Sequence, residues 1–549
     1  MAAVCHREII MQGGKADAAP AADSAAGASH EKHVGEYKKE LGLWHVVFLA
    51  VGAILGPAIA FTPVSVLAFA GPAGIASWII SLLLIFPLAM VYAELGTMWP
   101  KSGGVAYYPL RSNGALVGLF NGWGAFVGYV IAPASIIIAF VQYVSYFWPA
   151  LFQKGTLSAL GIALSIGIMF TVFLINILRI RRIGDINNIL TILTIALIAV
   201  IVVVLLFYFA PSNVTGATPG GYFYMGSAGL FVAVSATIYG YGGFRQPVDY
   251  AEEIHDPGKN VPKAIAATLL ITATVYLMES LAFAGAINWS AVGAAPGDWG
   301  ALLSLPYPFV TVSNGVRLAS LAIVSIVVAL IASYKDGIIY FGAAARVGNT
   351  MSRYDYFFPQ KLGDLNKKGV PFVAAILALV VTVFFILLLP AFSEIFSVVV
   401  DGLLVSYAPG AISLAVFRKR YPNEHRPYKL PLYQIFAPFS FIVASLLILF
   451  SEWFATSILI VTVLLGVFFL AVYHKRKGIH RQDLVLGIWY PIYLFTILAI
   501  SYFSSYGGTG LIPFPYDTLT YIVAMAIFYV WGYYTGVAYK ERADFTSQT

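Results

Sequence analysis

Apolar residues along this chain come in runs of about 20, separated by short polar or charged segments. A run of that length crosses the hydrocarbon core of a bilayer as a helix. We therefore expect an all-α, polytopic membrane protein with about 14 transmembrane helices. The predicted spans are 44–69, 74–96, 115–149, 158–178, 186–210, 226–254, 263–287, 312–345, 370–390, 393–417, 431–451, 455–473, 484–505 and 517–539.

Composition and charge support a membrane protein. The chain is 60% hydrophobic and 10% charged, whereas a soluble domain carries roughly 25% charged residues. If both termini are cytoplasmic, most of the 32 Lys and Arg residues lie in the termini and loops on the cytoplasmic side. This is the distribution that the positive-inside rule describes. This bias also accounts for the net charge of +7, so no nucleic-acid partner is expected. We predict a multi-pass protein of the plasma (cytoplasmic) membrane.

Two of the predicted helices contain interruptions. Gly56-Pro57 lies inside the first, and three glycines fall within residues 239–244 of the sixth. Proline removes a helical hydrogen bond, and clustered glycines weaken a helix. In hydrocarbon the freed backbone groups cost several kcal/mol unless protein, water or ligand satisfies them. The two breaks are five helices apart, the spacing expected of inverted repeats with a binding site between them near the bilayer midplane.

The chemistry of such breaks suits a zwitterion. Half-helix N-termini offer N–H groups and a partial positive charge to a carboxylate, and the exposed carbonyls could take an ammonium. An amino acid carries both groups. The alternative is that these residues are ordinary packing glycines and proline kinks, which are common in membrane helices.

Four stretches resemble the amino acid–polyamine–organocation permeases. They are Gly52–Ile59 with Pro63, Ala93–Gly104 with Tyr107-Tyr108, Gly243-Phe244 with Ala251–Ala264, and Arg346–Pro359 with Lys368–Pro371. The resemblance implies a leucine-transporter-like 5+5 inverted repeat with broken helices 1 and 6. It also implies secondary active transport of an amino acid by alternating access.

The expected organisation follows from this resemblance. We predict a disordered cytoplasmic tail over residues 1–36 and a transporter core of helices 1–10 over 37–420. Four additional transmembrane helices would occupy 421–540, and a second cytoplasmic tail 541–549. The lone Cys5 excludes a disulfide within the chain.

The resemblance and the breaks together give a candidate site, with three departures from the family pattern. The family's usual Gly-Ser-Gly is Gly56-Pro57-Ala58 here, Arg245 replaces a frequent carboxyl, and Thr194 lies where some proton-coupled members place a lysine. The candidate substrate-binding residues are Ala53, Ile54, Gly56, Pro57, Ala58, Tyr239, Gly240, Gly242, Gly243 and Arg245.

Several charged residues lie inside predicted spans, where a charge at mid-bilayer costs about 2.5–3.5 kcal/mol. Our hypothesis is that the Lys335 ammonium occupies the position where sodium-coupled relatives bind sodium, and that its protonation couples proton movement to transport. Candidate ion-coupling residues are Lys335, Asp336 and Thr194. The alternatives are a structural Lys335–Asp336 pair, or a lysine that contacts backbone carbonyls of helix 1.

The other intramembrane charges leave similar alternatives open. Arg245 either lines the substrate path or pairs with Asp249, four residues later on one helix face. Glu279 and Asp401 are isolated carboxylates that serve either as proton sites or as hydrogen-bonding groups between helices.

Enzymatic functions find no support in the sequence. It contains no phosphate-binding Gly-x-x-x-x-Gly-Lys-[Ser/Thr] motif, no metal-ligand spacing among the histidines and no nucleophile–base pair. We therefore expect a transporter with no cofactor and no bound metal, whose partners are an amino acid, protons and the lipid bilayer. The alternatives are a polyamine or organic-cation transporter of the same fold and a non-transporting nutrient sensor. The oligomeric state is not predicted.

Overall fold

The computed structural model describes residues 35–354, 359–388, 392–477 and 480–541. The side chains of Tyr239, residues 392–401, Glu452 and residues 473–477 lie outside this description, as do Cys5 and most of both predicted tails. The chain divides into two units, Met1–Lys32 and His33–Thr549. Everything below concerns the second unit.

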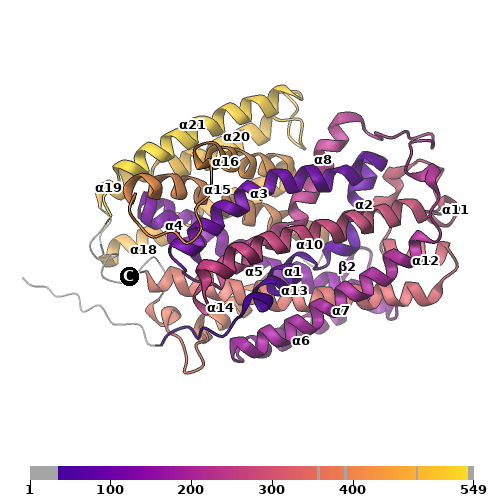
Figure 1. Cartoon of the computed structure of the whole chain (residues 1–549), viewed down its shortest axis with the longest axis horizontal. Helices are drawn as coiled ribbons and strands as arrows, with labels where there is room; N and C mark the ends of the chain where they lie inside the picture. Colours follow the sequence, from indigo (N-terminus) through magenta and orange to yellow (C-terminus); the bar gives the residue numbers. More distant parts are fainter. Residues whose placement is uncertain (1–34, 355–358, 389–391, 478–479, 542–549) are drawn as a thin grey trace, which may run out of the picture. The chain divides into compact units, whose positions relative to one another are not determined.

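The second unit is almost entirely helical (Figure 1). Its first half contains α1 (Leu43–Ile54), α2 (Ala58–Ala70), α3 (Gly74–Met98), α4 (Gly104–Asn113), α5 (Ala115–Val144), α6 (Ala159–Asn176), α7 (Ile180–Leu206), α8 (Gly226–Gly240), α9 (Gln246–Asp249) and α10 (Pro257–Ala286). Its second half contains α11 (Trp289–Val292), α12 (Pro308–Gly315), α13 (Ala319–Arg353), α14 (Phe372–Leu388), α15 (Phe392–Arg420), α16 (Tyr433–Phe450), α17 (Glu452–Leu464), α18 (Val467–Lys477), α19 (Arg481–Gly487), α20 (Trp489–Phe503) and α21 (Tyr516–Ala538).

Shorter elements connect these helices. A two-stranded antiparallel hairpin, β1 (Phe152–Gln153) and β2 (Thr156–Leu157), links α5 to α6. The 3₁₀ turns are η1 (Gly71–Ala73), η2 (Pro149–Leu151), η3 (Pro211–Asn213), η4 (Gly242–Arg245), η5 (Ala251–Glu253), η6 (Trp299–Ser304) and η7 (Gln360–Gly363).

Membrane-spanning length was the main prediction from the sequence. In the described part of the chain, 10 helical segments are long and apolar enough to cross a membrane, one of them running through α2 and α3. Leu43–Ile54 and Phe372–Leu388 are shorter apolar helices. The predicted span 312–345 begins later in the structure, because α12 ends at Gly315 and α13 begins at Ala319. The total of 14 spans stays a prediction.

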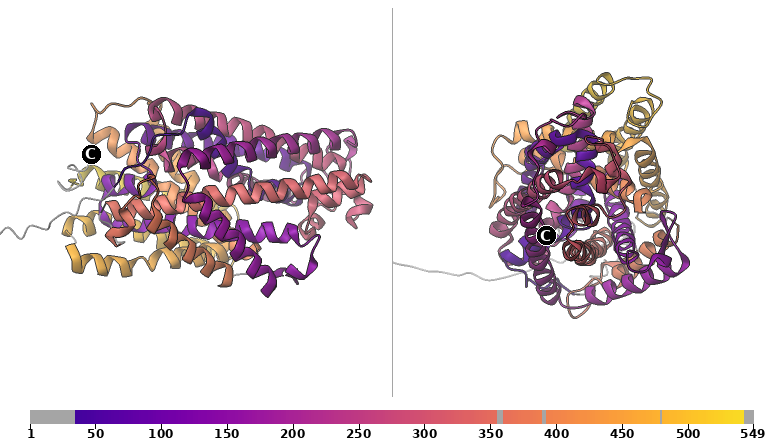
Figure 2. Two further views of the ribbon diagram at one scale, coloured as in Figure 1. Left: turned by 90° about the horizontal axis from the view of Figure 1, so that it is seen from below. Right: turned by 90° about the vertical axis from the view of Figure 1, so that its right-hand side faces the viewer.

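Helix α5 lies inside the bundle and packs against α4, α13, α14 and α15. A methyl group on Gly128 of α5 would come within 2.9 Å of the carbonyl carbon of Gly402 on α15. Small residues let membrane helices approach this closely. In contrast, α7 exposes large apolar side chains such as Ile189, Ile192 and Val203, as expected of a surface that faces lipid. The views in Figure 2 show the same bundle from below and from one end.

Three segments meet at the end of the bundle that the charge distribution assigns to the cytoplasm. The N–H groups of Glu40 and Leu41 donate to the carbonyl of Glu253 at 3.0 and 2.9 Å, and the N–H of His255 donates to the carbonyl of Leu41 at 2.9 Å. The Glu253 carboxylate accepts two hydrogen bonds from Arg346 of α13, at 2.6 and 2.7 Å. The start of α1, the segment after α9, and α13 are thus joined at Glu253.

Candidate functional site

The first interruption lies between α1 and α2. Helix α1 ends at Ile54, Leu55 has a non-helical backbone (φ −84°, ψ 53°), and α2 begins at Ala58. Pro57 sits directly before α2, where its missing N–H costs little. In the described part of the chain, the N–H groups of Gly56 and Ala58 have no hydrogen-bond partner. The break therefore leaves two backbone donors open.

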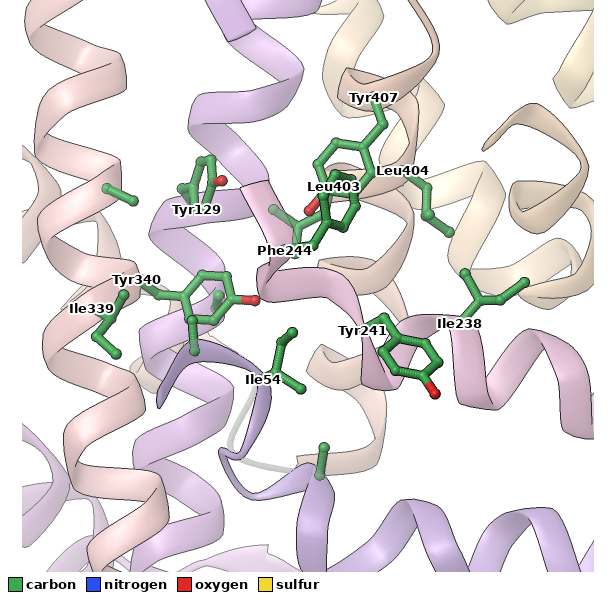
Figure 3. Close-up of a cluster of buried hydrophobic side chains, with 14 of the residues drawn as sticks. Ile54, Tyr129, Ile238, Tyr241, Phe244, Ile339, Tyr340, Leu403, Leu404 and Tyr407 are labelled. Atoms are coloured by element: carbon green, nitrogen blue, oxygen red, sulfur yellow. The ribbon is translucent and has the colours of Figure 1, made fainter. Parts of the chain in front are cut away.

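The second interruption lies between α8 and α9. Helix α8 ends at Gly240, and the turn η4 follows before α9. This turn packs directly on the end of α1, because a methyl group on Gly243 would lie 2.8 Å from the carbonyl carbon of Ala53. Only glycine fits so close to another backbone. Figure 3 shows Ile54 at the end of α1 near Tyr241 and Phe244 of this turn.

A small cavity lies between the two interruptions. Its volume is about 20 Å³, room for about one water molecule. Six residues of the predicted site line this cavity: Ala53, Ile54, Pro57, Ala58, Gly240 and Asp336. The remaining lining residues are Ala132, Ser135 and Ile136 of α5, Tyr340 of α13 and Leu403 of α15. In Figure 3 the Tyr340 hydroxyl points towards the α8–α9 turn.

Lys335 of α13 reaches the carbonyls that the first break exposes. Its Nζ donates to the carbonyl oxygens of Gly52 at 2.7 Å and Leu55 at 2.6 Å. The lysine thus contacts backbone carbonyls of helix 1, one of the alternatives expected from the sequence. Among the described residues, Lys335 does not form an ion pair with Asp336, because its nitrogen is not within 4.0 Å of either carboxylate oxygen. Successive helical residues point about 100° apart, so the two side chains diverge.

Asp336 faces the cavity instead. Its side chain is buried, with 4% of the residue exposed, and it packs against Gly56, where any Cβ would collide with the carboxylate. Its Oδ1 has no hydrogen-bond partner among the described residues. Asp336 therefore presents a buried, unsatisfied carboxylate oxygen beside the first break.

Arg245 is enclosed on the other side of the second break and does not line the cavity. Its Nε contacts the Asp249 carboxylate at 3.2 Å. Its Nη2 and Nη1 donate to the Tyr129 hydroxyl at 2.8 Å and the Ser406 hydroxyl at 3.1 Å. The Tyr129 hydroxyl in turn donates to Asp249, and the Tyr407 ring lies 4.4 Å from the guanidinium carbon. The Arg245–Asp249 pairing considered from the sequence is therefore present.

The remaining predicted residues with described side chains fall outside the cavity lining. Gly56 lies behind Asp336, and Gly242 and Gly243 belong to η4. The Thr194 hydroxyl donates to the Leu190 carbonyl of its own helix at 2.8 Å. The side chain of Tyr239, a predicted substrate-binding residue, lies outside the described residues.

Two polar residues of α7 that sequence reasoning missed lie against Gly52, in the last turn of α1. A methyl group on Gly52 would lie 2.7 Å from Asn187 Oδ1 and 2.9 Å from Thr191 Oγ1. They precede Thr194 by one to two helical turns, and their polarity within an apolar helix was the available signal. Of the lining residues, Tyr340 could have been found because it follows Asp336 by four positions on one helix.

The remaining candidates are a metal site and two isolated carboxylates. Among the described residues, no group of three His, Cys, Asp or Glu side chains could hold a metal ion. Glu279 of α10 is buried, and its Oε2 has no partner in the described part of the chain, but it does not line the cavity. The side chain of Asp401 lies outside the described residues.

Comparison with known proteins agrees with the resemblance seen in the sequence. The sequence model of an amino acid permease family matches residues 41–469. The glutamate/serine transporter AimA of Bacillus subtilis (strain 168) is 28% identical over 93% of this chain and 96% of its own length. The aspartate-proton symporter of the same organism is 29% identical over 93% of this chain and 99% of its own. The branched-chain amino acid permease BcaP, also of that organism, is 25% identical over 83% and 97%.

These matches cover most of the chain. They confirm the predicted transport function, as opposed to an enzymatic one, and the predicted leucine-transporter-like fold class. The chain belongs to the amino acid permease family.

Proposed function

We propose that this protein carries an amino acid across the cell membrane by proton-coupled alternating access, with the substrate held in the cavity between the two helix breaks. The observation that carries the proposal is the contact of Lys335 Nζ with the Gly52 and Leu55 carbonyls. A cation there stabilises the unwound end of α1. A relative named as an aspartate-proton symporter supports a proton as the coupling ion. The positive-inside bias supports cytoplasmic termini.

The coupling step follows from this contact. While protonated, the Lys335 ammonium ties α13 to both carbonyls at the end of α1. Loss of one proton removes a donor and the charge, which weakens the attachment of α1 to α13. Proton release on one side of the membrane would then favour the conformation in which α1 has moved. Transport and proton movement become linked because both act on the same helix end.

The substrate carboxylate would bind at the start of α2. The N–H groups of Gly56 and Ala58 are open, and the N-terminal end of a helix carries a partial positive charge. Pro57 provides no N–H between them. The carboxylate would therefore contact two separated backbone donors.

The cavity favours a neutral side chain, because its described lining contains no cationic side chain. Its volume of about 20 Å³ holds about one water molecule, so it must widen to admit an amino acid. Arg245, which the sequence offered as a partner for an acidic side chain, is already paired with Asp249. We therefore expect glycine, alanine or serine to be preferred over aspartate and glutamate, although two relatives are named for glutamate/serine and aspartate transport.

The test is uptake by purified protein in liposomes, with a panel of labelled amino acids and an imposed pH or sodium gradient. We expect accumulation driven by an inward proton gradient and little response to sodium. Lys335→Ala should abolish the pH-driven component, whereas Lys259→Ala, which removes an exposed lysine of α10, should leave it unchanged. Sodium-driven uptake that ignores pH, or proton-driven uptake by Lys335→Ala, would overturn the coupling mechanism.

A second candidate is uptake of an organic cation or polyamine. The Asp336 carboxylate in the cavity lining favours it, whereas the open N–H groups of Gly56 and Ala58 favour a substrate with a carboxylate. Labelled putrescine in the same liposomes separates the two. Putrescine uptake that alanine does not inhibit would support the cation transporter.

A further inference from the structure

The carbonyls of the first break are largely occupied by the protein's own groups. Lys335 Nζ holds those of Gly52 and Leu55. The Tyr276 hydroxyl of α10 donates to the Ile54 carbonyl at 2.7 Å. The broken helix therefore keeps few backbone acceptors for a substrate.

Backbone hydrogen bonds take further acceptors. The carbonyls of Val51, Gly56 and Pro57 accept the N–H groups of Leu55, Ile59 and Ala60 at 2.8, 3.2 and 3.0 Å. In the second break the Tyr407 hydroxyl donates to the Gly242 carbonyl at 2.5 Å. At the α1–α2 break, the Ala53 carbonyl accepts no hydrogen bond from the described residues. Its helical partner would be residue 57, which is a proline and has no N–H. One neutral carbonyl does not balance the full charge of an ammonium.

Asp336 supplies the missing charge. A buried carboxylate requires a cation or hydrogen-bond donors, yet its Oδ1 has neither among the described residues. It lines the same cavity as Ala53 and Gly240. Gly240 ends α8, and the C-terminal end of a helix adds partial negative charge. Negative groups thus gather at the cavity, close to the open N–H group of Gly56.

We propose that the Asp336 carboxylate binds the α-ammonium of the substrate, with the Ala53 carbonyl as a further acceptor. This inference rests on the proposed amino acid transport and deepens it: the ammonium is held by an ionic contact from α13. The bound substrate then contacts Asp336 through its ammonium and the neighbouring N–H groups of Gly56 and Ala58 through its carboxylate. Gly56 must lack a side chain because the carboxylate occupies the space where Cβ would lie.

This arrangement explains why Lys335 and Asp336 are neighbours in the sequence. The two opposite charges on α13 face different parts of α1, one its carbonyls and the other the cavity. Together they leave the site without net charge, and a zwitterionic substrate does not alter that balance. A substrate that lacks the ammonium would add an uncompensated negative charge in the membrane.

The test compares binding of alanine and of propionate, which lacks only the amino group, to full-length purified protein by calorimetry. We expect the wild type to prefer alanine by about 30-fold or more, since truncating one partner of a buried charge pair costs at least that much in affinity. Asp336→Asn should reduce the preference below about threefold. Glu279→Gln, which neutralises a buried carboxylate outside the cavity, should keep the wild-type preference.

Each outcome decides the inference. A wild-type preference below threefold, or an Asp336→Asn protein that keeps the full preference, would overturn it. If Asp336→Asn does not fold, Asp336→Glu replaces it, and an unchanged affinity for alanine in that longer-chain variant would count against the inference. A wild-type protein that neither binds nor transports any amino acid would instead refute the proposed function.

Discussion

The two helix breaks resemble each other in sequence but differ in what surrounds them. At the α1–α2 break the N–H groups of Gly56 and Ala58 are open, and Asp336 Oδ1 has no partner in the described chain. At the α8–α9 break, Arg245 of η4 makes hydrogen bonds to Asp249, Tyr129 and Ser406. The first break presents open backbone N–H groups beside an unpaired carboxylate oxygen. At the second, the Arg245 side chain is enclosed by hydrogen bonds, although Gln246 and one oxygen of Asp249 have unpartnered atoms among the described residues.

The difference shows that an interrupted helix is not by itself a binding site. Both breaks free backbone groups that cost several kcal/mol in hydrocarbon unless satisfied. In the second, the Tyr407 hydroxyl of α15 satisfies the Gly242 carbonyl, and side chains of α5 and α15 hold Arg245 in place. In the first, part of it is left for a ligand. We therefore expect substitutions at the second break to affect stability, and substitutions at the first to affect transport.

The largest expected effect is on stability, from Arg245→Met. Removing the guanidinium leaves Asp249 buried without its cation, which costs about 3–5 kcal/mol. Thermal unfolding in detergent, followed by size-exclusion chromatography, should show a lower Tm. The double variant Arg245→Met/Asp249→Leu should recover most of the loss, because an apolar pair can replace a buried ion pair. A normal Tm with altered substrate selectivity would mean that Arg245 lines the substrate path.

A smaller effect on transport should distinguish the two breaks directly. Gly56→Ala places a methyl group against the Asp336 carboxylate, whereas in Gly242→Ala the nearest atom is the Tyr340 hydroxyl oxygen at 3.8 Å. Overpacking costs about 1–3 kcal/mol, so Gly56→Ala should raise the KM for uptake by about fivefold or more. Gly242→Ala should stay within about twofold. Equal effects of the two variants would contradict the comparison.

The smallest effect should come from Thr194→Val on α7. The Thr194 hydroxyl bonds to its own helix, so its loss should change the initial uptake rate by less than about twofold and leave the pH dependence intact. Thr191→Val, which alters the group facing Gly52, should have the larger effect. A shifted pH profile in Thr194→Val alone would restore Thr194 as a coupling residue.

Much of the fold could be predicted because membrane helices need long apolar runs, and Pro57 marks a break through its missing N–H. The divergence of Lys335 and Asp336 could also have been predicted, since adjacent helical residues point about 100° apart. The environment of Arg245 could not. Helices that are apolar on all sides carry little sequence signal for the direction each side chain faces. The partners Tyr129 and Ser406 lie far away in the sequence.

The junction at Glu253 has a mechanical consequence. Its backbone carbonyl holds the segment before α1, and its carboxylate holds Arg346 of α13. Helix α1 therefore cannot tilt without moving the segment that follows α9, unless these hydrogen bonds break. We expect α1 and the segment after α9 to move together as one unit when the site opens to the cytoplasm. Spin labels at Gly42 and His255 should keep one separation in every transport state.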